Sequence, residues 1–387
     1  MSYDTWQSLP DMFFEIAERG DDSAFLWAKK GGRYEALSWR DTAERVRNMA
    51  KGLAGLGVAP GDRIAIVAEN SPEWAIADLA IMTLGAISVP AYTTNTVRDH
   101  RHVLSDCGAK GVIVSTRDLA ARLLPAAADV AATEFIITME STESGAFDTA
   151  LHEWAAVMAS GAASDHDLEP GLTAQTRRDV ACLIYTSGTG GNPKGVMLSH
   201  AAIMINCMGA CELLRQLGLG DEVFLSFLPL SHAYEHTAGL YFPISIKAQI
   251  YYAESIETLS ANLLEARPTI MVSVPRLYEV MHRRITLGLK RQSALKQSLF
   301  AKAVALGRKS YEKPGSLGLV QTALNRVLER LVRDKVRARF GGRLKAMISG
   351  GAPLNTEVGM FFTALGVRLL QGYGQTEAAP VISCNPP

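Results

Sequence analysis

The sequence lacks the features that would place it among membrane-spanning, secreted or disulfide-stapled proteins. Its five cysteines are scattered, without a C-x-x-C pair, so neither a disulfide framework nor a zinc site is predicted. The longest apolar stretch, residues 74–90, contains Asp78 and Gly85 and is too short to span a bilayer. The first fourteen residues show no basic region followed by an apolar one, so no secretory signal is visible. We therefore expect a cytoplasmic globular protein with free thiols.

The sequence also has no net charge, because 39 basic residues balance 39 acidic ones, but the charges are unevenly distributed. Residues 276–345 contain 18 Lys or Arg against 4 Asp or Glu, so this segment carries +14 and the remainder −14. The basic residues alternate with Leu and Val at helical spacing, which is typical of the solvated face of amphipathic helices. The same pattern would suit a surface that attracts anionic lipid or a phosphate-rich cosubstrate. Interleaved aromatic residues are missing, which argues against a nucleic-acid partner.

The order of apolar segments predicts an α/β fold. A chain of 387 residues exceeds one ordinary core, so two or three subdomains are expected. Residues 63–69 form a buried strand in this prediction, and residues 71–85 form a helix that begins with Ser-Pro. Short strands that alternate with helices of this length favour parallel sheets. The acidic stretch 140–178 is rich in Ala, Ser and Gly and is expected to form a loop and a helix that join one subdomain over 1–179 to a second over 180–387.

The segment "YTSGTGGNPKGV", residues 185–196, is the most distinctive in the chain. It fails the Walker pattern, because its lysine follows Pro193 and an extended segment follows the loop in place of a helix. Its chemistry nevertheless suits a polyphosphate, since glycines can turn backbone N–H groups toward an anion. Hydroxyls and a mobile ammonium add further donors. The sequence therefore predicts a phosphate-binding loop between two strands, with these residues as donors: Thr186, Ser187, Gly188, Thr189, Gly190, Gly191 and Lys194.

Three further segments make this loop recognisable. They are "LPLSHAYEHTAG" (228–239), "SGGAPL" (349–354) and "QGYGQTE" (371–377). In order and spacing the four segments resemble the signature of the adenylate-forming, AMP-binding superfamily, in its long-chain fatty acyl-CoA synthetase form. Gly190 stands where a threonine is common in the family, which removes one hydroxyl donor. The resemblance implies the family's large N-terminal domain, an α/β fold with two parallel-type subdomains and a smaller β-rich part, incomplete at its C-terminus.

The resemblance also implies a reaction. A long-chain fatty acid is activated by ATP to an acyl-adenylate and is then transferred to coenzyme A, giving acyl-CoA, AMP and pyrophosphate. Placement and charge neutralisation carry such a reaction, so no general base is needed. The implied catalytic residues are Thr186, Lys194, His232 and Glu377, with Mg²⁺ near Thr186 and Glu377. His232 and His236 are implied at the acyl substrate. The implied adenine and α-phosphate contacts are Gly351, Ala352, Pro353, Gln371, Gly372, Tyr373, Gly374 and Thr376.

Two alternatives accompany this interpretation. One is an acyl-AMP ligase that loads a carrier protein, and the other is a fragment that binds ATP and an acyl group without catalysis. Members of the family continue with a ribose-binding aspartate, a hinge and a mobile C-terminal domain that carries an essential lysine. None of these is present in the sequence, so we expect the chain alone to show little turnover. The expected location is cytoplasmic, with residues 276–345 in contact with the inner face of the membrane.

Overall fold

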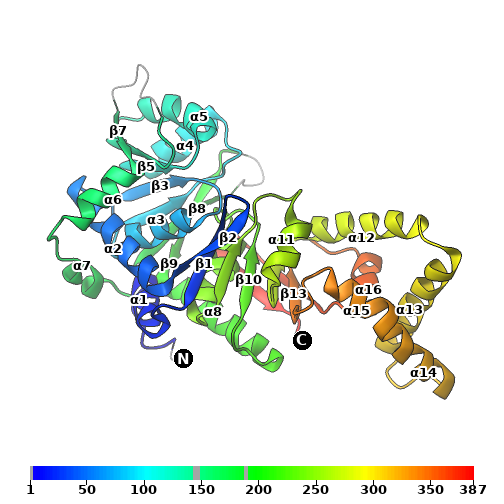
Figure 1. Cartoon of the computed structure of the whole chain (residues 1–387). Coiled ribbons are helices and arrows are strands. Elements are labelled where there is room, and N and C mark those ends of the chain that lie inside the picture. The colour runs from blue at the N-terminus through cyan, green and yellow to red at the C-terminus, as the bar shows by residue number, and fades with distance from the viewer. Residues whose placement is uncertain (1–2, 143–148, 187–190) are drawn as a thin grey trace. The chain divides into compact units, whose positions relative to one another are not determined.

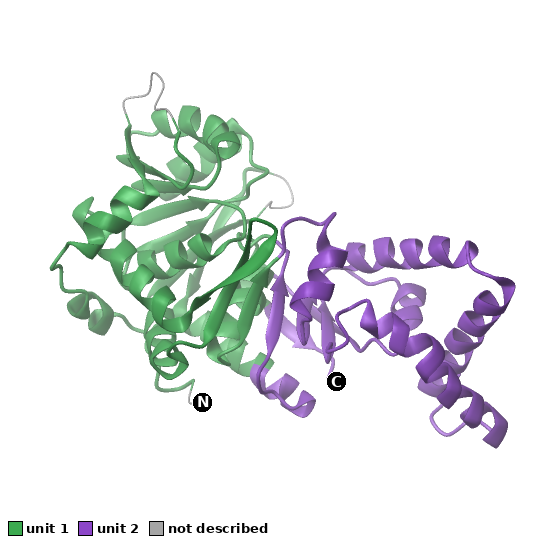
Figure 2. Cartoon of the chain, viewed as in Figure 1, with its two compact units in different colours: residues 1–210, 229–252, 376–380 green, residues 211–228, 253–375, 381–387 purple. Residues whose placement is uncertain are grey.

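The structure is a computed structural model that describes residues 3–142, 149–186 and 191–387 (Figure 1). It is a mixed α/β protein, as the sequence predicts. The chain forms two compact units, which Figure 2 shows in different colours. Unit 1 comprises residues 1–210, 229–252 and 376–380, and unit 2 comprises residues 211–228, 253–375 and 381–387. All five cysteines have free thiols.

Unit 1 is built on a seven-stranded sheet in the order β7-β6-β5-β3-β4-β8-β9. All neighbouring strands are parallel except β8 and β9, which are antiparallel. The central strands are buried on both faces, which explains their continuous apolar sequences. The strands are β3 (Arg63–Val67), β4 (Ile87–Pro90), β5 (Gly111–Val114), β6 (Phe135–Thr138), β7 (Ala150–Glu153), β8 (Val180–Thr186) and β9 (Lys194–Ser199).

The helices of unit 1 begin where the sequence supplies capping groups. The predicted helix after residue 71 is α3 (Pro72–Thr83), whose N-cap Ser71 accepts a hydrogen bond from the Trp74 backbone N–H at 3.2 Å. Helices α4 (Val97–Cys107) and α5 (Arg117–Ala128) pack together on one face of the sheet. The remaining helices are α1 (Leu9–Gly20), α2 (Trp39–Gly55), α6 (Trp154–Ala162), α7 (Glu169–Ala174), α8 (His200–Leu214), α9 (Ala233–Glu235), η2 (His236–Tyr241) and α10 (Phe242–Ser245).

An N-terminal hairpin, which the sequence did not predict, also belongs to unit 1. Strands β1 (Ala24–Lys30) and β2 (Arg33–Ser38) pair antiparallel, and β1 pairs in parallel with β11 (Gln249–Tyr252). The side chains of β2 are mostly exposed or half-buried, so its sequence carries little apolar signal.

The stretch 140–178 contains helical structure, as expected, and also a strand that the sequence did not predict. It supplies β7, which extends the sheet beside β6, and α6, which packs against α2. Strand β8, which begins the predicted second subdomain, lies beside β4 in the same sheet. A boundary between residues 179 and 180 therefore stays a prediction.

Unit 2 contains strands in the order β15-β14-β13-β12-β10, parallel except for the pair β14–β15. The strands are β10 (Val223–Ser226), β12 (Ile270–Ser273), β13 (Ala346–Ser349), β14 (Leu369–Gly374) and β15 (Val381–Cys384). The predicted basic segment is helical, as expected. The helices and turns of this unit are η1 (Arg215–Leu217), α11 (Leu259–Ala266), α12 (Pro275–Lys290), α13 (Ala294–Glu312), α14 (Leu319–Leu328), η3 (Glu329–Arg333), α15 (Asp334–Ala338) and α16 (Thr356–Ala364).

A buried arginine ties the basic helices of unit 2 together. Arg333 is 3% exposed, and its guanidinium donates to the carbonyl oxygens of Ala303 at 2.6 Å and Ala364 at 2.8 Å. It also donates to the Asn325 side chain at 2.8 Å. Because these partners lie on α13, on α14 and at the end of α16, one side chain satisfies polar groups from three helices around a small apolar core.

The close packing of α2 against α6 in unit 1 can be tested by one substitution. A Cβ at Gly161 would lie 1.7 Å from the Asn48 carbonyl oxygen. We expect Gly161→Ala to lower the free energy of unfolding by about 3 kcal/mol, because overpacking against backbone forces the helices apart. Gly209→Ala is the matched control, since a Cβ there meets nothing within 4 Å and should stabilise α8 by up to about 1 kcal/mol. Denaturant unfolding would contradict this account if both variants were equally stable.

Candidate adenylation site

The predicted phosphate loop joins two antiparallel strands. The chain leaves β8 at Thr186 and returns in β9 at Lys194, and the register pairs these two residues directly. Directly opposed residues project to the same face of a strand pair, so the side chains of Thr186 and Lys194 leave the same face of the hairpin at the mouth of the loop. The strand–loop–strand prediction is therefore confirmed for its flanks. Of the predicted loop donors, Gly191 is exposed, while Ser187, Gly188, Thr189 and Gly190 lie outside the described residues.

Helix α4 holds both strands of this hairpin in place. The Tyr185 hydroxyl donates to the Asp106 carboxylate at 2.7 Å, and His102 Nε2 lies 2.8 Å from the Pro193 carbonyl oxygen. Since a carbonyl only accepts, His102 must carry a proton on Nε2. The two rings also meet edge to face, with centroids 6.1 Å apart. A Cβ at Gly195 would lie 3.0 Å from the Tyr185 ring, so the absence of a side chain at this position leaves room for the ring.

These contacts give His102 a role at the hairpin that the sequence did not predict. Its partner is a backbone carbonyl of the loop segment, which no sequence motif announces. The Tyr185 pKa is raised well above its usual range by burial and by the hydrogen bond to Asp106, so the phenol remains a donor at neutral pH.

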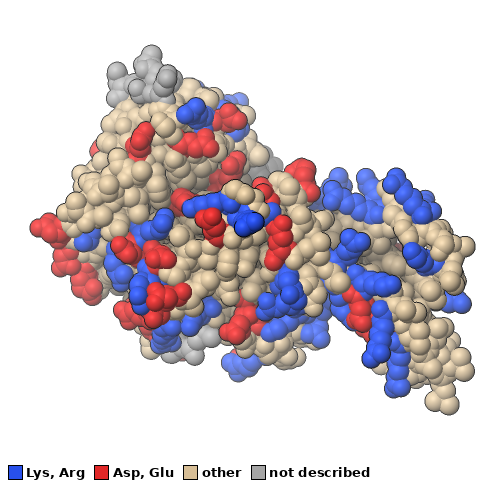
Figure 3. Space-filling view, viewed as in Figure 1, with Lys and Arg blue, Asp and Glu red and all other residues tan. Residues whose placement is uncertain are grey.

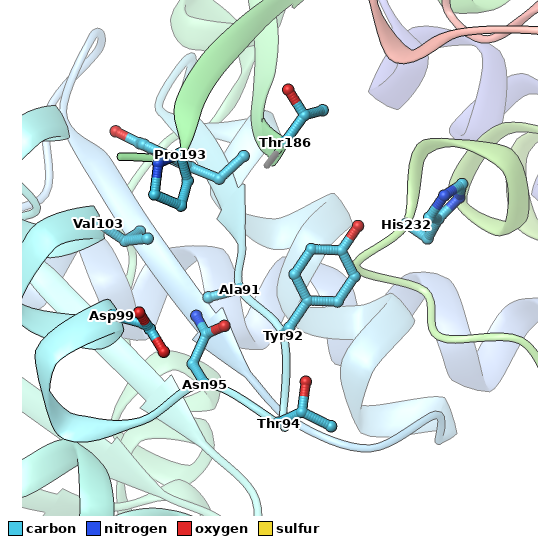
Figure 4. Close-up of a pocket in the computed structure, with 10 residues that line it drawn as sticks. Ala91, Tyr92, Thr94, Asn95, Asp99, Val103, Thr186, Pro193 and His232 are labelled. Atoms are coloured by element: carbon cyan, nitrogen blue, oxygen red, sulfur yellow. The ribbon is translucent and has the colours of Figure 1, made fainter. Parts of the chain in front are cut away.

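A cavity of about 480 Å³ opens beside the hairpin, entirely within unit 1 (Figure 4). It brings together Thr186 and His232, two predicted catalytic residues that lie on separate elements. In Figure 4, Tyr92 projects its hydroxyl into the space between them. Among the described residues, the lining consists of Ala91, Tyr92, Thr94, Asn95, Asp99, Val103, Tyr185, Thr186, Pro193 and His232. The segment after β4 was not predicted as part of the site, because its polar residues match no motif.

The environment of His232 determines which nitrogen of its ring carries the proton. Its Nδ1 accepts a hydrogen bond from the Tyr234 backbone N–H at 3.1 Å, so the N-cap of α9 fixes the ring. His232 is exposed to the cavity, yet surrounding protein atoms desolvate it and lower the pKa of its imidazole below the usual value. The neutral ring with an acceptor Nδ1 must carry its proton on Nε2. His232 can therefore donate a hydrogen bond to an anionic oxygen in the cavity.

His236, which was predicted at the acyl substrate, lies in a different environment. It is fully buried, and its Nε2 lies 3.1 Å from Asp78 Oδ2. The same carboxylate oxygen accepts a hydrogen bond from the Tyr241 hydroxyl at 2.5 Å. His236 is not among the residues that line the described cavity. Contact between His236 and an acyl chain stays a prediction, while its observed partners fix the segment that carries His232.

The remaining predicted residues fall into two groups. Thr376 and Glu377 belong to the short turn η4 (Thr376–Ala378), which lies against β9 in unit 1. The Asn206 side chain on α8 donates to the Ala378 carbonyl oxygen at 2.9 Å and holds this turn. The predicted adenine contacts belong to unit 2, where Gly351, Ala352 and Pro353 follow β13 and residues 371–374 lie on β14.

In unit 2 the register of β13 and β14 brings the two adenine motifs together. Ser349 pairs with Gln371, so both motifs occupy the carboxyl ends of neighbouring parallel strands, where α/β sheets bind ligands. The Tyr373 side chain is 65% exposed, which leaves its ring free to stack on a base. Gly351 has φ of +80°, a conformation that favours glycine.

The residues that could hold a metal are few. The described part of the chain contains no group of three or more His, Cys, Asp or Glu side chains placed to bind an ion. Mg²⁺ needs no such cage when it is bound through one or two protein oxygens and substrate phosphates. A threonine hydroxyl and a carboxylate are suitable donors for that arrangement, so the pair predicted for Mg²⁺ fits the ion chemically.

Comparison with known proteins identifies the family. Residues 13–387 match the family model described as AMP-binding enzyme. The chain belongs to the AMP-binding enzyme family. This AMP-binding chain is 32% identical over 371 residues to the long-chain-fatty-acid–CoA ligase FadD15 of Mycobacterium bovis, covering 95% of the chain and 60% of that protein. It is 27% identical to the long-chain-fatty-acid–[acyl-carrier-protein] ligase AEE15 of Arabidopsis thaliana, covering 98% and 58%.

A solved structure supports the fold of the AMP-binding chain. The adenylation domain of a carboxylate reductase from Mycobacterium chelonae superimposes with a TM-score of 0.74 at 21% identity, covering 98% of the chain and 59% of that structure. The fold expected from the motifs, that of the family's N-terminal adenylation domain, is thereby confirmed. The chain spans about 60% of the length of the curated relatives it matches. Within the described ranges, no helix combines the length and apolarity needed to cross a bilayer.

The pKa of His232 and the position of its ring proton can be measured directly. We expect nitrogen-detected NMR of histidine-labelled protein to show a pKa below about 6.5 and a proton on Nε2 at neutral pH, because desolvation disfavours the imidazolium. His232→Gln would assign the signal by its loss. A pKa above the usual imidazole value, or a proton on Nδ1 in the neutral ring, would contradict this account.

Proposed function

We propose that the chain carries the adenylation site of a long-chain fatty acid–CoA ligase. The enzyme would form an acyl-adenylate from ATP and a fatty acid and pass the acyl group to coenzyme A, with release of pyrophosphate and AMP. The observation that supports this most directly is the cavity shared by Thr186 and His232, with Lys194 paired to Thr186 across the hairpin, in a member of the AMP-binding enzyme family. The 32% identity to a long-chain-fatty-acid–CoA ligase supports the substrate class.

The proposed roles follow from charge. The β- and γ-phosphates of ATP would lie at the hairpin, where Lys194 offsets negative charge and Thr186 donates a hydroxyl. The Nε2–H of His232 would donate to an oxygen of the fatty acid carboxylate or of the α-phosphate, where negative charge accumulates. Thr376 would contact the α-phosphate. Since a fatty acid carboxylate is ionised at neutral pH, it can attack phosphorus without a general base, which agrees with the neutral, proton-donating state of His232.

The remaining ATP contacts are proposed on the same basis. Thr186 and Glu377 would hold Mg²⁺, whose charge would neutralise the phosphates when it is bound. Tyr373 would stack on the adenine. The other proposed adenine contacts are Gly351, Ala352, Pro353, Gln371, Gly372 and Gly374, while Ser187, Gly188, Thr189, Gly190 and Gly191 would supply loop donors.

A second candidate shares the first half-reaction and differs in the acceptor. An acyl-AMP ligase would transfer the acyl group to the phosphopantetheine of a carrier protein, and the 27% identity to an acyl-carrier-protein ligase gives this candidate support. The two can be separated by adding free coenzyme A or a phosphopantetheinylated carrier to preformed acyl-adenylate and measuring its consumption. Faster consumption with the carrier would favour the second candidate. Cytoplasmic placement and low turnover of the chain alone stay predictions.

Acyl selectivity can be tested without turnover. The probes are unreactive acyl sulfamoyl-adenosines in a series from acetyl to stearoyl. We expect the long-chain analogues to bind the chain more tightly than the acetyl analogue, by about tenfold or more, because each buried methylene contributes about 0.8 kcal/mol. Isothermal titration gives the affinities, and competition by ATP shows that the nucleotide site is used. Preference for short acyl groups would make the long-chain assignment wrong. Failure of every analogue and of ATP to bind would overturn the adenylation proposal itself.

A further inference from the structure

The apolar residues of helix α14 are only partly covered by the rest of unit 2. Its Leu324 and Leu328 pack with Ala303 of α13 in the small apolar core of unit 2 described above. On the other side, Leu319 is 92% exposed and Val320 is 82% exposed. Val327 and Leu331, at 52% and 46%, continue this outer face by helical spacing through η3. A solvated helix ordinarily has one apolar stripe, so the outer face is an unpartnered one.

Basic residues border this outer face. Arg326 and Arg330 are exposed and lie four residues apart, one position before Val327 and Leu331 respectively. Lys335 continues the basic side in α15. We name the exposed set Leu319, Val320, Arg326, Val327, Arg330 and Leu331 the α14 outer face.

The positive charge at this face is not neutralised locally. Each of the four acidic residues of 276–345 already has a basic partner in the structure: Glu279 with Arg276, Glu312 with Arg308, Glu329 with Arg333 and Arg337, and Asp334 with Arg337. Within the described ranges, neither Arg326 nor Arg330 forms an ion pair. Figure 3 shows Lys and Arg gathered over the α12–α15 region, with uncharged surface at the α14 tip.

We propose that the α14 outer face docks on the surface of an anionic lipid bilayer. The apolar side chains would enter the interface between headgroups and acyl chains, and the arginines would meet lipid phosphates. Leu319 and Val320 project into solvent, since they are 92% and 82% exposed and follow the exposed residues 313–316 that connect α13 to α14. A deformable bilayer accommodates projecting side chains without a matching groove, whereas a protein partner must supply one. The inference is independent of the proposed reaction.

Sedimentation with vesicles tests this proposal without ATP or an acyl substrate. We expect the chain to bind vesicles of phosphatidylcholine mixed with phosphatidylglycerol about tenfold or more tightly than phosphatidylcholine alone, with binding weakened by salt. Leu319→Asp/Val320→Asp should reduce binding by about tenfold or more, because it removes the inserting side chains. Arg326→Glu/Arg330→Glu should cause a similar loss by reversing two charges.

Matched control variants show whether vesicle binding depends on the α14 outer face or on any exposed apolar or basic residue. Ile256→Asp changes a 64% exposed isoleucine elsewhere in unit 2, and Lys30→Glu/Arg178→Glu reverses two exposed charges in unit 1. Both should bind vesicles within about twofold of the unchanged chain, and thermal unfolding should confirm that all variants fold. Equal loss in the control variants, or vesicle binding indifferent to lipid charge, would overturn the proposal. Capture of an acidic carrier protein through Arg326 and Arg330, without vesicle binding, would assign the face to a protein partner instead.

Discussion

The candidate site depends on how the β8–β9 hairpin is held. A loop that carries phosphate-binding donors is useful only if its two ends are fixed, because ordering the loop at the moment of binding would weaken the affinity for the anion. Tyr185 and Pro193 are held to α4 by Asp106 and His102, one contact on each side of the loop. The antiparallel register then sets Thr186 beside Lys194. A strand–loop–strand design can thus present a phosphate cradle without the helix N-terminus that a Walker loop uses.

A second set of contacts fixes the short segment that carries His232. The backbone N–H of His236 donates to the His232 carbonyl oxygen at 3.0 Å, and the His236 ring is held by the buried Asp78 on α3. The same short segment therefore exposes one histidine to the cavity and buries the other beside a carboxylate. The two side chains differ in environment although they are four residues apart, so neighbouring motif histidines should not be assigned one role.

Local sequence signals predicted much of this architecture. Continuous apolar runs predicted β3 and the other central strands, and the Ser71-Pro72 pair predicted α3. The mismatch with the Walker pattern led to the prediction of a loop between two strands, which β8 and β9 confirm. Long-range contacts explain what was missed. The helix expected in the Ala, Ser and Gly-rich stretch is present as α6, but no local pattern announces its close packing at Gly161 against Asn48. His102 likewise becomes a site residue only through its contact with Pro193, 91 positions away, and Tyr92 only by lining the same cavity as Thr186 and His232.

The central claim, that this hairpin binds the phosphates of ATP, is tested most directly by isothermal titration of the chain with Mg·ATP. We expect Lys194→Ala and Thr186→Val each to weaken binding, the lysine variant by about tenfold or more, because a charge-assisted hydrogen bond contributes about 1.5–3 kcal/mol. Lys30→Ala, which removes an exposed lysine at the end of β1, should leave the affinity unchanged. Unaltered ATP affinity in folded Lys194 and Thr186 variants would contradict the account.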